Sequence, residues 1–129
     1  MEPVREGSPT ARRLERARRA AVDLRRMERA AAKAPGDGFA DASAEARDRC
    51  RAVVADADRA IWGAEGLAGP LAASILRLRY LDALTWRQVA AAVGMSPSRC
   101  RKAAGDAMAL MDAAGHDGGT SERERWGHA

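Results

Sequence analysis

The sequence predicts an all-α protein, and its composition and periodicity carry that prediction. Aromatic residues make up only 4% of the 129 residues, and Ala and Arg dominate. A core must therefore be built from Ala, Leu, Val and Met on helices, with little of the material that strands favour. Segments 8–33, 43–62 and 70–112 carry apolar residues at helical spacing, and helix caps or stop signals mark their ends.

The first predicted helix begins at Ser8-Pro9, an N-cap followed by proline at the first helical position, and ends at Lys33 before Pro35-Gly36. One narrow stripe of this helix is apolar and consists of Leu14, Ala17, Ala21, Leu24 and Ala31. Arginines occupy much of the remaining surface. A helix with so thin a stripe is unstable alone and needs a partner.

The second predicted helix is capped by Ser43, extends to Trp62 and supplies that partner. It has an apolar stripe of similar length with acidic residues beside it. We therefore expect residues 8–66 to form an antiparallel helical hairpin, a coiled-coil-like arm whose flanks have opposite charge. The arginines are expected to pair with the acidic helix and to keep the arm soluble, with contact to DNA phosphates as the alternative. The Ala-rich stripes also leave room for a homodimer through this arm.

A glycine-rich joint separates this arm from the next predicted domain, 67–114. Gly63, Gly66 and Gly69 lie close together and predict a hinge. Gly69-Pro70 then begins a helix that carries the strongest core signal in the chain, made by Leu71, Ile75, Leu78 and Leu81. The sequence thus predicts a small three-helix domain that opens on this helix.

The other two helices of this domain form a predicted helix-turn-helix. Thr85 and Gln88 make a capping box that begins a short helix, and Gly94 permits the positive φ that ends it. Ser96 as N-cap and Pro97 at the first helical position then begin a second helix, predicted over 97–112. In such a unit the second helix enters the major groove of DNA, so we expect 97–112 to be a recognition helix.

The candidate DNA-binding residues lie around the start of this recognition helix. We assign base contacts to Ser98, Arg101 and Lys102, because the two long donors reach guanine O6 and N7 and a serine hydroxyl can contact several base edges. Phosphate contacts are assigned to a second polar and basic set, Thr85, Arg87, Ser96, Arg99 and Arg77. The alternative is that this basic helix start is only a solvated surface.

Charge is distributed unevenly along the chain. The net charge is +4, with a pI near 9.8. Residues 8–33 hold nine Lys or Arg against three acids, 34–66 hold four against seven, and 70–112 hold six against three. Two basic segments therefore flank an acidic one, a pattern that favours an acidic partner such as double-stranded DNA.

The residues give no indication of catalysis, a cofactor or a metal site. Cys50 and Cys100 lie in separate predicted helices on apolar faces, which favours reduced, buried thiols. His116 and His128 lie in 115–129, a tail without apolar periodicity that we expect to be disordered. No nucleophile, base and orienting group can be assembled, so we expect no enzyme. No apolar run has the length of a membrane span and the N-terminus is not signal-like, which predicts a cytoplasmic protein.

The predicted domain 67–114, called the head from here on, also resembles a known group of DNA-binding domains. The resemblance rests on Ile75-Leu-Arg-Leu-Arg-Tyr-Leu-Asp-Ala-Leu-Thr-Trp-Arg-Gln-Val-Ala, then Val93-Gly-Met-Ser and Ala107-Met108. This pattern is similar to the fourth-region helix-turn-helix of bacterial sigma factors, and closer still to the ArpU and RinA-type phage transcriptional regulators. The resemblance implies a prophage-encoded regulator of late genes in a bacterial nucleoid, with base-reading positions at Ser98, Arg101 and Lys102.

The function we expect is therefore sequence-specific DNA binding by a transcription regulator, dimeric through the arm and with RNA polymerase as a further partner. Two alternatives stay open. A small terminase-type subunit for DNA packaging also combines a helix-turn-helix with a helical oligomerisation arm. A pure interaction module would use the same fold to contact polymerase without reading DNA.

Overall fold

The computed structural model describes residues 8–33 and 44–128, the last 13 of them by backbone alone. Every regular element in these ranges is helical, which confirms the predicted all-α class. The elements are α2 (Pro9–Lys33), α4 (Ala44–Ala68), α5 (Pro70–Leu76), the π-helix η1 (Arg77–Leu81), α6 (Trp86–Val93) and α7 (Pro97–His128).

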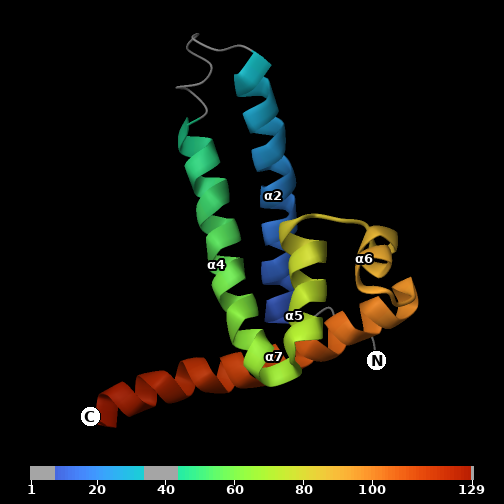
Figure 1. Cartoon of the computed structure of the whole chain (residues 1–129). Helices are drawn as coiled ribbons and strands as arrows, with labels where there is room; N and C mark the ends of the chain where they lie inside the picture. Colours follow the sequence, from blue (N-terminus) through green and yellow to red (C-terminus); the bar gives the residue numbers. More distant parts are fainter. Residues whose placement is uncertain (1–7, 34–43, 129) are drawn as a thin grey trace.

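Helices α2 and α4 lie side by side and run in opposite directions (Figure 1). Helix α5 packs against the lower half of α4, and η1 reaches α2. Helix α7 crosses the lower ends of α2 and α4, and α6 sits on the first part of α7 (Figure 1). The middle of α7, at Asp112, is thereby held against the beginning of α2.

The hydrophobic core is one cluster to which α2, α4, α5, α6 and α7 all contribute. Its largest fully buried side chains are Leu14, Ile61, Ile75, Leu76, Val89 and Cys100. The segments predicted as arm and head therefore share apolar contacts. Neither Cys50 nor Cys100 is in a disulfide; the first is half-buried and the second fully buried.

Most of the glycine-rich joint is helical, so of the three glycines predicted to form a hinge only Gly69 lies at a turn. Helix α4 continues through Gly63 and Gly66 to Ala68, and the chain turns only at Gly69, whose φ is +97°. The side chains of Ile61 and Ala64 are fully buried. Their packing outweighs the roughly 0.5 to 1 kcal/mol that each glycine costs a helix. The predicted boundary between 66 and 67 thus falls inside a helix.

The helix predicted to run through Leu81 changes to π-helix at Arg77. Arginines of α2 hold the carbonyl groups where it ends. Arg18 donates to the carbonyl oxygens of Arg79 and Ala83 at 3.2 and 3.3 Å, and Arg25 donates to that of Asp82 at 2.8 Å. Carbonyls at a helix end have no partner within the helix, so these side chains satisfy them from outside.

Helix α7 is longer than the sequence predicted. We expected it to end near Asp112 and to be followed by a disordered tail over 115–129, whereas its backbone is helical to His128. Proline is the residue most able to end a helix, and the sequence holds none after Pro97. The predicted stop rested on fading apolar periodicity, which reports a loss of packing and not a loss of helix.

Candidate nucleic-acid interface

Helix α6 and the turn that joins it to α7 have the capping interactions that the sequence predicts. The N–H of Gln88 donates to Oγ1 of Thr85 at 3.1 Å, and the N–H of Thr85 donates to Oε1 of Gln88 at 2.9 Å. Gly94 ends α6 in the left-handed region with φ +74°. Oγ of Ser96 accepts from the N–H of Arg99 at 3.1 Å. Both helix ends at this turn are therefore fixed by local hydrogen bonds.

Packing decides which side of α7 faces solvent. Val89 of α6 and Cys100 of α7 are fully buried. The opposite side of the first turns of α7 is exposed and carries the three side chains predicted to read bases, Ser98, Arg101 and Lys102. Arg99 is exposed beside them. These side chains are thus accessible to a partner.

Lys102 has one partner on the same helix. Its Nζ lies 3.1 Å from Oδ2 of Asp106, and both side chains are more than two-thirds exposed. Such an exposed pair one helical turn apart contributes only about 0.2 to 0.5 kcal/mol. A stronger anion can therefore take Lys102 from Asp106 at little cost.

Three of the predicted phosphate contacts, Thr85, Ser96 and Arg87, are also exposed. The hydroxyls of Thr85 and Ser96 accept cap hydrogen bonds, and each still has its own hydrogen to donate. Thr85 and Arg87 lie at the start of α6, and Ser96 lies at the start of α7. Their exposed donors are accessible to a partner at these two helix starts.

Arg77, the remaining predicted phosphate contact, is engaged within the protein. Its Nε lies 3.2 Å from Oδ1 of Asp58, and its guanidinium stacks 4.9 Å from the ring centroid of Trp62. The side chain is 30% exposed. Arg77 therefore joins η1 to α4, and we leave it out of the contact set proposed below.

Arg79 is likewise turned inward. Its guanidinium lies 4.7 Å from the ring centroid of Trp86, and Nη1 donates to the carbonyl oxygen of Leu84 at 3.1 Å. Burial lowers the pKa of Arg79. The ring of Trp86 meets that of Tyr80 edge to face at 6.5 Å. Trp86 thus covers the junction between η1 and α6.

A groove of about 840 Å³ between α2 and α7 was not predicted from the sequence. Its charged lining residues are the arginines Arg12, Arg13, Arg16, Arg19 and Arg101 and the acids Glu15 and Asp56. Tyr80, Trp86 and Met108 also line it. Arg101, predicted to read bases, therefore shares a concave surface with the arginine-rich face of α2. The spacing of Arg12, Arg16 and Arg19 indicates a common helix face, but nothing local indicates which helix that face meets.

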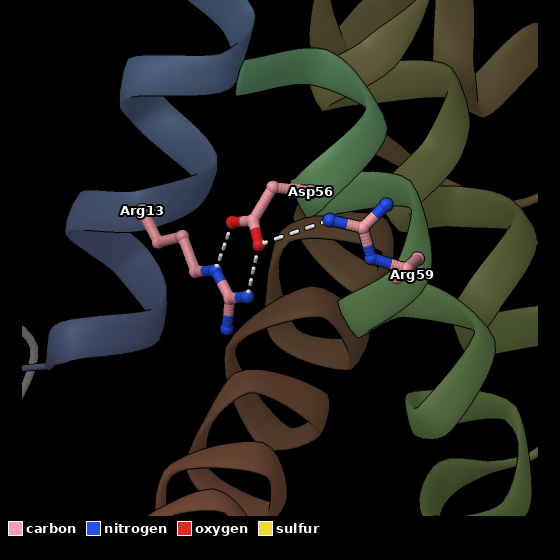
Figure 2. A network of polar contacts seen from close by, with 3 residues as sticks. All are labelled: Arg13, Asp56 and Arg59. Carbon is pink, nitrogen blue, oxygen red and sulfur yellow. Dashed lines mark hydrogen bonds and ion pairs between the residues drawn. The ribbon is translucent and has the colours of Figure 1, made fainter. Parts of the chain in front are cut away.

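The wall of this groove contains one ion-pair network, shown in Figure 2. Nε and Nη2 of Arg13 donate to the two carboxylate oxygens of Asp56 at 2.8 and 2.9 Å, and Arg59 approaches Oδ1 at 3.7 Å. The hydrogen bonds from Arg13 lower the pKa of Asp56 and raise that of Arg13. A second pair between α2 and α4 joins Glu28 to Arg51 at 3.3 Å. The predicted pairing of an α2 arginine with an α4 acid is therefore present at Arg13 and Asp56, whereas Glu28 and Arg51 pair with the charges reversed.

The fold and this surface define an all-helical protein with an exposed basic helix start and an arginine-lined groove. Comparisons of the chain with models of protein families, with curated proteins and with solved structures found no match. Within the described residues, no three His, Cys, Asp or Glu side chains group as metal ligands would. No helix in that part of the chain is both long and apolar enough to span a membrane.

Proposed function

We propose that this chain is a sequence-specific DNA-binding transcription regulator. In this proposal α6 and α7 form a helix-turn-helix, α7 is the recognition helix, and its first turns enter the major groove. The observation that carries the proposal is the exposure of Ser98, Arg101 and Lys102 together, at a helix start that two capped ends hold in place.

The chemistry of these side chains supports base reading. Arg and Lys donate to the paired acceptors on guanine, and one good bidentate contact discriminates against a wrong base by about 1 to 3 kcal/mol. Ser96 and Arg99 at the start of α7, and Thr85 and Arg87 at the start of α6, supply donors for phosphates. Base readers and positioning residues thus lie at the exposed starts of two consecutive helices.

The remaining helices and the cellular role follow from this proposed DNA-binding surface. We infer that α2 and α4 form the helical hairpin arm and that α5 with η1, α6 and α7 forms the sigma-like head. By its resemblance to the ArpU and RinA-type regulators, the chain acts at late-gene promoters of a prophage, in the bacterial nucleoid. RNA polymerase is the partner that such a role requires.

Selection from a random duplex pool tests the proposal. The full chain, immobilised, is expected to enrich one sequence motif over successive rounds at physiological salt. Failure to enrich any motif, with retained binding to the pool, would reject sequence-specific recognition. If the chain is instead a polymerase-interaction module that does not read DNA, its double variant Arg101→Ala with Lys102→Ala will still bind RNA polymerase.

The assembly state tests the proposed role of the arm. Light scattering is expected to give the mass of a homodimer formed through α2 and α4, in keeping with the two-fold symmetry of many operators. A ring of about eight or more copies would point instead to a small terminase-type packaging subunit.

A further inference from the structure

We propose that the groove between α2 and α7 holds the phosphodiester backbone of the same DNA duplex whose bases α7 reads. This inference rests on the proposed function and extends it to a second element. It assigns Arg16 and Arg19 of α2 as the phosphate-binding residues. The arginine-rich helix then serves binding as well as the packing of the arm.

The spacing of the arginines gives the groove a continuous cationic wall. Arg12, Arg16 and Arg19 are four and three residues apart, so their side chains lie on one face of α2. The seven residue-to-residue steps from Arg12 to Arg19 rise about 10 Å along the helix. One DNA strand carries a phosphate about every 3.4 Å of its axis, so this wall is long enough to follow a short stretch of strand.

The groove holds more cationic charge than its own acids compensate. Arg13 and Asp56 bind each other through two hydrogen bonds and neutralise one another. Glu15 is the one remaining acid of the lining. Within the described part of the chain, Arg19 and Arg101 have no hydrogen bond or ion pair, and Arg16 interacts with Asp56 only through longer-range charge attraction. Three such guanidinium groups facing one concave surface favour a bound anion.

The position of the groove fits a backbone that runs beside the recognition helix. Arg101 lines the groove and also lies on the exposed start of α7. The base-reading surface of α7 and the arginine-lined wall of the groove therefore meet at Arg101. On α7 the groove is bordered by Ala104 and Gly105, whose small size leaves room for a sugar and its phosphate. A strand leaving the major groove at Arg101 would reach Arg16 and Arg19 next.

Fluorescence anisotropy of the full chain tests this inference on two labelled duplexes, one selected from the pool and one of random sequence. We expect Arg16→Ala with Arg19→Ala to weaken binding to both duplexes equally, on the order of tenfold, and to reduce the slope of log K against log salt by about two. Glu15→Gln is expected to strengthen binding two- to threefold on both, because it removes the acid from the groove.

The control is a charge-matched double variant, Arg29→Ala with Arg49→Ala. Both residues are exposed and lie outside the groove lining. We expect a loss of no more than about twofold from the change in net charge alone. Circular dichroism melting of each variant shows whether the helical fold is retained.

The outcomes separate this inference from the proposed function. If the chain prefers the selected duplex but the Arg16 and Arg19 variant matches the control, the groove does not bind DNA and the proposed function stands. If no sequence is preferred but that variant loses affinity for random DNA, the groove stands and base reading by α7 is rejected. Absence of binding to either duplex overturns both.

Discussion

The hydroxyl of Ser8 donates a hydrogen bond of 2.6 Å to the carboxylate of Asp112. The N–H of Thr10 donates to the other carboxylate oxygen at 2.9 Å, and Oγ of Ser8 accepts from the N–H of Ala11 at 2.9 Å. One carboxylate on α7 thus binds the cap and first turn of α2, where a negative charge also meets the positive end of the helix dipole. This contact joins α7 to the start of α2, the two helices between which the groove lies.

Replacing Asp112 by alanine is expected to destabilise the fold. The variant loses two hydrogen bonds to a charged group and leaves a helix start without its partner, a cost of about 1 to 3 kcal/mol. Urea denaturation measures this change. Asp106→Ala is the control, because its exposed pair with Lys102 contributes at most about 0.5 kcal/mol. Equal effects of the two substitutions would show that the contact between α2 and α7 is not stabilising.

The same contact predicts a pH dependence. Burial opposes ionisation of Asp112, but the hydrogen bonds from Ser8 and Thr10 outweigh it and lower the pKa of this carboxyl. A lowered pKa in the folded state means that the stabilisation is complete above the unfolded value of about 3.9 and is lost as pH falls through the folded value. The stability difference between the wild-type chain and Asp112→Ala is therefore expected to be constant from pH 7 to 5. It should shrink below about pH 4, and a difference that persists unchanged to pH 2 would contradict this assignment.

Arg77 and Arg87 are expected to behave differently, although both are basic residues of the head. Arg77→Ala removes the ion pair with Asp58 and the stacking on Trp62, so it should lower the free energy of unfolding by about 1 kcal/mol. Its affinity for DNA should stay that of the wild-type chain. Arg87→Ala removes an exposed charge, so it should weaken binding to every sequence without affecting stability. If Arg77→Ala instead weakened DNA binding and Arg87→Ala lowered stability, Arg77 would be a DNA contact and Arg87 a stabilising residue.

Val89→Asp tests the packing of α6 on α7. Val89 is fully buried, so an aspartate there brings an unpaired charge into the core and should unfold the chain. Ala91→Asp, on the exposed side of the same helix, is the matched control and should melt close to the wild-type temperature. Thermal melting followed by circular dichroism distinguishes them. A cooperative transition of Val89→Asp at the wild-type temperature would contradict the inward face of α6.

Both ends of α6 and the start of α7 could be predicted from the sequence because neighbouring residues determine them. The Thr85 and Gln88 box, the positive φ of Gly94 and the Ser96 cap each depend on atoms within four residues. The same reasoning failed at Gly63 and Gly66. Their intrinsic preference for a turn was overridden by the burial of neighbouring α4 side chains, which only the assembled core shows.

The groove and the ends of η1 depend on contacts between distant parts of the chain. Arg18 and Arg25 bind carbonyl groups more than 50 residues away, and Ser8 binds a carboxylate 104 residues away. A sequence pattern shows that such side chains share a helix face, but it does not show which surface they meet. The sequence therefore predicts ion pairing with α4 for the arginines of α2, although several of them donate to carbonyl groups at the end of η1 or line the groove.

The most direct test of the account is the affinity of the wild-type chain and of Arg101→Ala for the selected duplex and for a scrambled one. We expect the substitution to cost the selected duplex about 1 to 3 kcal/mol more than the scrambled duplex and to relax the preference at one base position. Equal losses on the two duplexes would contradict the assignment of α7 as the helix that reads the DNA sequence.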